Sequence, residues 1–451
     1  MKVIIVGAGI AGLSLAIALT QSSHQVVLVE SASELAELGA GVQMTPQAIK
    51  YLFKWGMKND LMDKSIRPEC MYIWHYKDGK LIGTLPLGQM DRRYGAPYIV
   101  IHRGMLHSIL HKHAVKAGTQ IKLSSKVIQY DFPRGAVELD TGETLEADLV
   151  VAADGINSFA RQQLLGESDP GSRPTGWAAF RLSAEMSKIR RDPLIAKAIN
   201  LDSGCSNFWV APHKSCMTYL IKGATTLNIV LSHRDIIDTS RFSLEEYRQA
   251  SREMFRDFDK PVQRLLELST PKIANFPAYE VPPLPKWTDS SGRFTLIGDA
   301  AHASVYFLSM GVSLAVEDAT ALSTAINYVE TRSAGLSQSQ ELLCKVMHVF
   351  QRVRMRRVLA VQKASSYAGE TLHVEDGEQR VALYEALSQS DRDILLPPYN
   401  PNSVASHTTQ IVPGQAERCG PGGISDKVTR DWCYGFDADK TILEALEMEC
   451  P

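Results

Sequence analysis

The chain has 451 residues, more than one hydrophobic core usually organises, so two domains or one large lobed unit are expected. Its 48 Lys and Arg residues nearly balance its 50 Asp and Glu residues, and the net charge of −2 excludes a global field that would attract nucleic acid or an anionic membrane, leaving a small molecule as the expected partner. The seven cysteines are an odd number without C-x-x-C spacing, which argues against a disulfide framework or a metal site and favours a reducing, cytoplasmic compartment.

Residues 3–20, VIIVGAGIAGLSLAIALT, are almost entirely apolar and allow three interpretations. A membrane-spanning helix needs about 20 uninterrupted apolar residues, and the glycines and Ser14 break this run. A signal peptide needs a basic start and a small-residue cleavage site, whereas Lys2 stands alone and the polar stretch TQSSHQ follows. The pattern therefore favours a strand that is buried on both faces, followed by a turn and a helix.

The turn GAGIAG matches the dinucleotide-binding pattern G-x-G-x-x-G. Gly7 allows the tight turn, Gly9 allows the backbone to approach a pyrophosphate, and Gly12 allows the helix to pack closely on the strand. A second apolar strand, QVVLVE, ends at Glu30, near the spacing expected for an acid that binds the adenosine ribose hydroxyls. Together these features predict a site for FAD or NAD at the start of the helix.

The stretch from residue 31 to residue 172 alternates between short helices and strands. A glycine-rich loop at 39–41 precedes an amphipathic helix whose start is marked by Thr45 and Pro46. Apolar periodicity then predicts strands at about 70–100, a helix at 102–118 and strands at 121–152. The last of these strands, DLVVAADG, is continuously apolar before it ends at Asp154 and Gly155.

Residues 173–232 have strand character, and with a helix near 243–268 they predict an inserted α+β domain. Strand and turn return in RFTLIGDAAH, and two helices follow at about 311–330 and 341–369. A tail from about 394 is rich in Pro, Gly and Ser and is expected to lack regular structure. The predicted organisation is a cofactor-binding domain in two parts, 1–172 and 276–375, whose first part includes short strands of the other domain at 70–100. An inserted substrate domain spans 173–275, and a largely irregular extension spans 376–451.

Three motifs occur in order along the chain: GAGIAG with Glu30, ADGINSFAR at 153–161, and LIGDAAH at 296–302. With these motifs the chain resembles the single-component, or class A, FAD-dependent aromatic hydroxylases built like para-hydroxybenzoate hydroxylase. It is most similar to the salicylate-hydroxylase-like branch, over about residues 1–375, and DWCYGFDA at 431–438 resembles the closing segment of fungal members. The resemblance implies an α/β fold with a Rossmann-like FAD-binding domain and an inserted α+β substrate domain, and a role in secondary metabolism.

The resemblance also implies which residues hold FAD. Glu30 would bind the ribose, Arg103 the flavin, and Asp299 the ribityl chain, while Asp154 would lie near FAD and influence how the nicotinamide is used. The full implied set is Gly7, Gly9, Ile10, Ala11, Gly12, Glu30, Gly41, Val42, Arg103, Asp154, Asp299, Gly311 and Val312, the last two at a helix start whose dipole would face the flavin pyrimidine edge. The alternatives are a solvated helix-start arginine for Arg103 and a turn or helix cap for either aspartate.

The chemistry implied by the resemblance belongs to the cofactor rather than to a side-chain nucleophile. NADPH or NADH would reduce FAD, O2 would form a flavin C4a-hydroperoxide, and oxygen would pass to an electron-rich aromatic or indole-like small molecule by hydroxylation or epoxidation. Arg181 matches an arginine of this branch beside the flavin ring, and it interrupts the small, apolar segment GWAAFRLS. A buried guanidinium needs an anionic or carbonyl partner, such as a substrate phenolate or amide; the alternative is a surface arginine in a local salt bridge.

Two tyrosines complete the predicted catalytic set. Tyr219 matches a family tyrosine that faces the pocket, although a core tyrosine is equally consistent with its position. Tyr306 stands where relatives usually have a proline, in a loop, 303–313, that runs past the reactive edge of the flavin. His302 is interpreted as a structural histidine.

The loop also departs from the family at Ser309 and Met310, and these substitutions with Tyr306 predict added apolar bulk and a freer backbone over the flavin. One interpretation is a pocket reshaped for a large polycyclic substrate. The other is altered or absent oxygen chemistry, which leaves an alternative function: a flavin-containing, non-redox cyclase or isomerase of natural-product biosynthesis.

Overall fold

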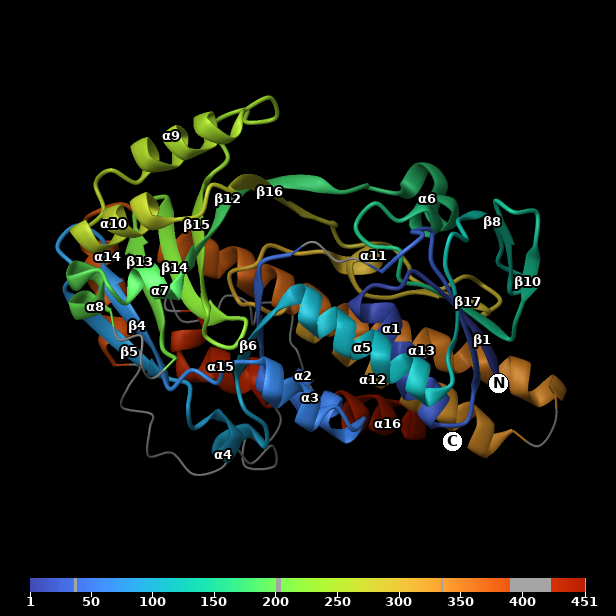
Figure 1. Ribbon diagram of the computed structural model, residues 1–451. Helices are drawn as coiled ribbons and strands as arrows, with labels where there is room; N and C mark the ends of the chain where they lie inside the picture. Colours follow the sequence, from blue (N-terminus) through green and yellow to red (C-terminus); the bar gives the residue numbers. More distant parts are fainter. Residues whose placement is uncertain (36–38, 200–203, 334–335, 390–422, 451) are drawn as a thin grey trace.

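The computed structural model describes residues 1–35, 39–199, 204–333, 336–389 and 423–450, and Figure 1 shows its two main sheets at opposite ends of the molecule. The first is a five-stranded parallel sheet with the order β17-β11-β1-β2-β7. Its strands are β1 (Lys2–Val6), β2 (Gln25–Val29), β7 (Gln120–Lys122), β11 (Leu149–Ala152) and β17 (Phe294–Leu296). Val3, Ile4 and Ile5 are fully buried, as expected of a central strand covered on both faces.

Helices predicted from the sequence cover this sheet. Helix α1 (Ile10–Gln21) follows β1 and packs against α5 (Arg103–Ala117) and α12 (Gly311–Arg332). The connection from β7 to β11 is a three-stranded antiparallel sheet of β8 (Val127–Asp131), β9 (Ala136–Leu139) and β10 (Thr144–Glu146). The short helix α6 (Phe159–Leu165) and a 3₁₀ turn, Gly166–Ser168, lead to the second main sheet.

The second main sheet has seven strands in the order β16-β12-β15-β14-β13-β4-β5. They are β4 (Cys70–His75), β5 (Leu81–Pro86), β12 (Arg173–Glu185), β13 (Ser206–Ala211), β14 (Lys214–Ile221), β15 (Thr226–Arg234) and β16 (Ala274–Glu280). Side chains alternate along each strand, so Phe180, Leu182 and Leu231 face one way, into a separate hydrophobic core that includes Phe255 and Val262. The side chains on the other face of the same strands point away from this core, and they can therefore line a binding site.

Several predicted elements are subdivided. The helix expected near 243–268 is two helices, α9 (Leu244–Met254) and α10 (Lys260–Leu268), because Asp259 accepts a hydrogen bond from the Val262 amide and starts a new helix. The 70–100 region contains α4 (Met90–Tyr94) besides its strands, and the inserted region contains α7 (Met186–Ile189) and α8 (Pro193–Ala198). A two-stranded ribbon of β3 (Gly41–Met44) and β6 (Ile99–His102) lies near α2 (Pro46–Lys54) and α3 (Lys58–Lys64).

The expectation that 376–451 is largely irregular is wrong for the described part of that region. Long helix α13 (Leu336–Leu372) is followed by α14 (Glu378–Ser388), a 3₁₀ turn η4 (Gly423–Ser425), α15 (Lys427–Tyr434) and α16 (Ala438–Glu449). Helix α16 packs on α12 and α13, burying Ile442 and Leu446, and Asp437 caps it by accepting a hydrogen bond from the Lys440 amide. The one-turn spacing of these apolar residues after a capping aspartate favours a helix. Most of the Pro-, Gly- and Ser-rich tail falls in 390–422, outside the described residues.

In the part of the chain that the structure describes, no disulfide joins the cysteines, which are Cys70, Cys205, Cys216, Cys344, Cys433 and Cys450. The sulfurs of Cys70 and Cys205 lie 3.0 Å apart. Across the described ranges, no helix combines the length and the apolar character needed to cross a membrane.

Candidate active site

The glycine-rich turn after β1 has the geometry that its sequence predicts. Gly7 has a φ of +103°, and a Cβ atom there would lie 2.5 Å from the Ala153 carbonyl oxygen. A Cβ atom on Gly12 would lie 2.0 Å from the Gly7 carbonyl oxygen, so helix and turn touch. At Gly9, by contrast, no described atom comes within 4 Å of that position, so the N-terminal end of α1 can be approached there. Ile10 and Ala11 form the buried first turn of the helix.

Glu30 follows β2 and is bound to the same turn. Its carboxylate accepts a 2.8 Å hydrogen bond from the Ala8 amide through one oxygen and a 2.8 Å bond from the Ala32 amide through the other. The carboxylate is therefore held at the edge of the glycine turn, where the predicted ribose contact requires it.

The other two motifs meet at the same edge of the sheet. Asp154 follows β11, and Asp299 begins the short helix α11 (Asp299–His302) after β17. Strand β11 is the parallel neighbour of β1 and β17 is the parallel neighbour of β11, so the carboxyl ends of the three strands lie at one edge of the sheet. Asp154 accepts a 3.2 Å bond from the Ala160 amide through Oδ2, but its buried Oδ1 has no partner within the described chain. Burial raises the pKa of Asp154, whereas Asp299 is exposed. An unpartnered buried carboxylate oxygen beside an exposed carboxylate and an open helix end fits a polyhydroxylated dinucleotide such as FAD.

Arg161, for which the sequence motifs predicted no role, joins the two aspartate motifs. The buried guanidinium donates from Nη1 to the carbonyl oxygens of Ile156, at 2.9 Å, and Ala300, at 3.1 Å. Its Nε donates to Asp169 at 3.0 Å. The sequence signal for this residue is its place as the last residue of ADGINSFAR; its buried partners become visible only in three dimensions.

The remaining predicted cofactor residues lie between the two sheets. The Arg103 amide donates to the Ala40 carbonyl at 3.0 Å, which joins the start of α5 to the glycine-rich loop. Gly41 is packed so closely on the second sheet that a Cβ atom would lie 2.4 Å from the Tyr219 ring. Gly41 and Val42 of β3 and Gly311 and Val312 of α12 line one cavity.

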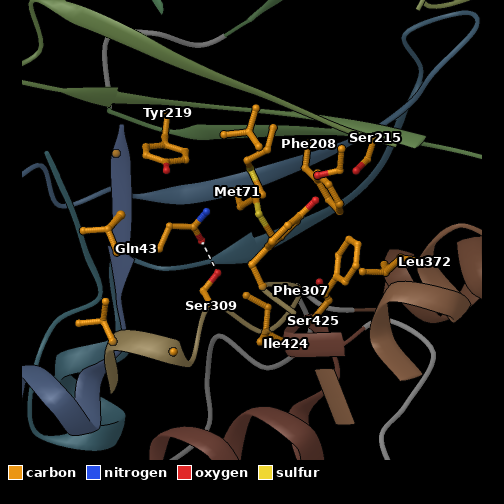
Figure 2. A pocket seen from close by; sticks show the side chains of 18 of the residues that line it. Gln43, Met71, Phe208, Ser215, Tyr219, Phe307, Ser309, Leu372, Ile424 and Ser425 are labelled. Atoms are coloured by element: carbon orange, nitrogen blue, oxygen red, sulfur yellow. Dashed lines mark hydrogen bonds between the residues drawn. The ribbon is translucent and has the colours of Figure 1, made fainter. Parts of the chain in front are cut away.

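This cavity, of about 250 Å³, lies on the free face of the seven-stranded sheet (Figure 2). Its floor contains one row of residues paired across four neighbouring strands: Arg181, Val230, Met217 and Phe208. The two-residue period of the strands puts these side chains in the cavity, while Phe180 and Leu182 point into the separate core. The predicted alternation around Arg181 is thus the reason that it reaches the site.

The three predicted catalytic residues, Arg181, Tyr219 and Tyr306, line this cavity together. The Nε atom of Arg181 is buried without a hydrogen-bond partner in the described chain, and the guanidinium lies over the Phe276 ring, 5.5 Å from its centre. Burial raises the pKa of Tyr219 and of Tyr306 to about 12, with the nearby Arg181 charge opposing the rise in both. Both tyrosines are therefore protonated at neutral pH, and the guanidinium lies in the cavity with an unused donor.

The unusual loop of residues 303–313 is anchored by polar contacts. The Tyr306 hydroxyl donates to the Ala178 carbonyl at 3.2 Å, which ties the loop to β12. Ser309 has a φ of +56°, an uncommon conformation for a non-glycine residue, and its hydroxyl donates to Gln43 Oε1 at 3.2 Å, as Figure 2 shows. The expectation that Met310 adds bulk over the flavin is not met, because Met310 is buried and its sulfur accepts a 3.3 Å bond from Gln47.

Gln43 was not selected from the sequence, where an isolated glutamine carries no signal. Figure 2 shows its side chain between Ser309 and Tyr219, and its Oε1 also accepts a hydrogen bond from the Tyr98 hydroxyl. It joins the loop to the ribbon of β3 and β6.

A buried network of charges holds the start of α12. Asp318 Oδ2 accepts bonds from the Gly298 amide at 2.9 Å and contacts His302 Nε2 at 2.6 Å, and its Oδ1 accepts a 2.8 Å bond from Arg354. Glu317 pairs with Arg354 at 3.0 Å and with Arg357 at 3.1 Å. Burial alone would raise the pKa of Asp318, but His302 and Arg354 lower it to about 2. His302 thus has a structural partner, in line with its interpretation.

A family model described as an FAD binding domain matches residues 1–343 of this chain. The FAD-dependent monooxygenase OpS4 of Beauveria bassiana is 28% identical over 391 residues, which cover 86% of this chain and 89% of that protein. Hispidin-3-hydroxylase of Neonothopanus nambi is 31% identical over 362 residues, which cover 75% of this chain and 84% of that protein. The solved structure of a salicylate hydroxylase substrate complex superposes with a TM-score of 0.73 at 21% identity and covers 99% of this chain and 98% of that one.

Proposed function

Because the chain belongs to the FAD binding domain family and is an FAD-dependent monooxygenase of the class A aromatic hydroxylase type, we propose that it uses NAD(P)H and O2 to hydroxylate or epoxidise an electron-rich aromatic or indole-like small molecule. The predicted family, α/β fold and FAD cofactor are confirmed. The nicotinamide, the oxygen chemistry and the substrate class are our proposal.

The observation that carries the proposal is the unpartnered Nε of Arg181, buried in a cavity that it shares with Tyr219 and Tyr306. A buried charged donor without a partner is costly in a folded protein, and an anionic or carbonyl oxygen of a substrate would satisfy it. Arg181 then binds and orients a phenolate, an enolate or an amide, and its charge favours the ionised form of a phenol, whose ring is richer in electrons than that of the neutral phenol.

Each tyrosine has a defined task in this arrangement. The Tyr306 proton is used by the Ala178 carbonyl, and Ser232 lies beside the phenol oxygen, so Tyr306 positions the loop and presents its oxygen as an acceptor that the substrate would share with Ser232. Figure 2 shows the Tyr219 hydroxyl directed into the site beside Gln43, from where a protonated phenol can donate to substrate. The apolar side chains of Val230, Met217 and Phe208 exclude water from the ring.

FAD would be held by the Gly7–Gly12 turn, by Glu30, Asp154 and Asp299 at the sheet edge, and by Gly41, Val42, Gly311 and Val312 beside the cavity, and when bound it supplies the transfer of electrons to O2 and of oxygen to the substrate. Arg103, at the start of α5, would contact the flavin. All of these assignments follow the resemblance, and the open approach at Gly9 and the unpartnered Asp154 Oδ1 support them.

The test is NAD(P)H consumption by the purified yellow protein, with and without a panel of phenols and indoles. We expect substrate-stimulated oxidation and one oxygen atom from ¹⁸O2 in the product. Conversion of a substrate under anaerobic conditions without a nicotinamide would instead point to the non-redox cyclase or isomerase.

A further inference from the structure

The wall of the cavity that lies opposite β3 comes from the C-terminal part of the chain. Leu372 of α13, Leu387 of α14, and Ile424 and Ser425 of η4 line the same cavity as Arg181. All four lie beyond residue 343, where the match to the family model ends. We call these four residues the C-terminal wall. The part of the chain that holds FAD and the part that closes the far side of the cavity are therefore different.

The cavity is polar on one side and apolar on the other. Figure 2 shows Gln43, Tyr219 and Ser309 on the side of β3, and Phe307, Leu372, Ile424 and Ser425 on the side of the C-terminal wall, which is therefore the more apolar of the two. The floor also becomes more apolar from β12 to β13. Charged Arg181 on β12 is followed by Val230 and Met217 and then by Phe208 on β13.

The serine at the far side of the floor does not offer a free donor. His373 is buried, and its Nδ1 donates to the Gly369 carbonyl at 2.6 Å, so its Nε2 accepts a 2.9 Å bond from the Ser215 hydroxyl. The Ser215 proton is thus used inside the protein. Apart from Ser425, the C-terminal wall presents the side chains of Leu372, Leu387 and Ile424 to a ligand, and Phe307 of the neighbouring loop extends this apolar surface.

The wall is held in place by two buried arginines, Arg430 and Arg357, and by the half-buried Arg93. Arg430 donates to the carbonyl oxygens of Ile424, at 3.0 Å, and Ser425, at 3.2 Å. Arg357 donates to the carbonyl oxygen of Cys433 at 3.0 Å, and Arg93 pairs with Asp431 at 2.6 Å. Because Arg430 and Arg357 bind backbone carbonyl groups at both ends of α15, they hold the residues of the wall in defined positions.

We propose that the C-terminal wall selects the substrate by its length: the enzyme takes a phenol or other acidic ring hydroxyl that carries an apolar chain of several carbons. The acidic oxygen binds Arg181 and Tyr219, the ring lies over Met217 and Phe208, and the chain contacts Leu372, Leu387 and Ile424. This inference rests on the proposed function, and it adds the class of substrate and the residues that limit the length of its apolar chain. An apolar wall facing a cavity gains free energy when an apolar group displaces water from it.

The test uses 4-n-alkylphenols from methyl to octyl and the FAD-loaded protein, with dissociation constants taken from the change in flavin absorbance. We expect affinity to rise about fourfold for each added methylene until the chain meets the wall, and then to level off or fall. Ile424→Trp should move this limit to a shorter chain, and Ile424→Ala to a longer one. Arg181→Met should weaken every member of the series by a similar factor.

Val428→Ala is the matched control, because Val428 lies on α15 next to the wall but is 64% exposed. It should leave the chain-length profile unchanged. FAD content and thermal unfolding of each variant show that it is folded, and Ile424→Ala provides the second variant if Ile424→Trp does not fold.

Affinity that is independent of chain length, or Ile424 variants that shift every phenol equally, would overturn the inference. Phenol-stimulated NAD(P)H oxidation, measured on the same samples, separates the two proposals. If the phenols stimulate oxidation but their affinity does not depend on chain length, the inference fails and the proposed function stands. If affinity depends on chain length but no oxygen is incorporated, the proposed function fails and the role of the C-terminal wall stands.

Discussion

At the scale of single residues, Arg181 is the most informative position for function. Its buried Nε has no partner in the described chain, and Arg181→Ala removes the charge without touching the residues predicted to hold FAD. We expect the variant to retain bound FAD and to lose substrate affinity by about 10- to 150-fold, the range for a hydrogen bond to a charged group of about 1.5–3 kcal/mol. Flavin absorbance measures the first and a substrate titration the second. Unchanged substrate affinity would show that Arg181 does not bind the substrate.

His373 makes a second residue-level prediction, which concerns pH. Burial lowers the pKa of His373 to about 3, from a usual value of about 6.5. Below pH 6.5 the unfolded chain binds a proton at this residue that the folded protein does not, so stability is lost as the pH falls toward 3, by up to about 1.4 kcal/mol per pH unit.

His373→Gln should therefore flatten the pH dependence of the free energy of unfolding between pH 6.5 and 3, relative to the wild type. His348→Gln, at an exposed position of the same helix region, is the control and should retain the wild-type slope. Urea unfolding at a series of pH values measures both. Identical slopes in all three proteins would show that His373 is not protected from protonation.

Among the helices and strands, the packing of α12 against α13 depends on charged side chains that are buried between the two helices. Arg354 is fully buried between Glu317 and Asp318, and removing one partner of a buried ion pair costs about 3–5 kcal/mol. Arg354→Met should thus lower the free energy of unfolding by about that amount. It should also weaken FAD binding, because Asp318 holds the Gly298 amide next to Asp299.

Arg356→Met offers a matched control two residues along the same helix, since Arg356 is exposed. Its effect on stability should stay within about 0.5 kcal/mol. Chemical unfolding and FAD titration of the two variants check both statements. Equal losses in the two variants would mean that the buried network is not what holds α12.

At the scale of the whole molecule, the cofactor cradle is assembled from residues between Gly7 and Val312, so FAD should stabilise the entire fold. A ligand present at 100 times its dissociation constant adds about 2.7 kcal/mol to the free energy of unfolding. Gly9→Ala should fold like the wild type without FAD, because the added methyl group meets no described atom within 4 Å, yet gain much less from added FAD.

Gly12→Ala is the contrasting variant, since its Cβ would lie 2.0 Å from the Gly7 carbonyl oxygen. It should be destabilised with or without FAD. Thermal unfolding with increasing FAD distinguishes the two glycines, and equal stabilisation of Gly9→Ala and wild type would argue against the predicted approach of FAD at this turn.

Features that depend on a few neighbouring residues could be predicted from the amino-acid sequence. Apolar strands followed by glycines or aspartates at 7, 154 and 299 predict the carboxyl edge of a parallel sheet, because that local pattern reports burial and turn geometry directly. The alternation around Arg181 likewise predicts which face of β12 it shares, and the three motifs in order were sufficient for the family.

How distant segments complete the site became visible only in the folded structure. The site depends on contacts between residues that are far apart in the chain: Gln43 with Ser309, Arg161 with two motifs, and the C-terminal wall with the cavity of Arg181. The spacing of apolar residues within one element does not predict such contacts. Helix α16 has a local signal in its capping Asp437 and in the spacing of Ile442 and Leu446, and the irregular composition of the preceding tail masked it. The buried arginine contacts of the C-terminal region, by contrast, exist only once α12 and α13 are packed. A buried polar contact depends on the register of whole elements, and that register is settled by the packing of the complete core.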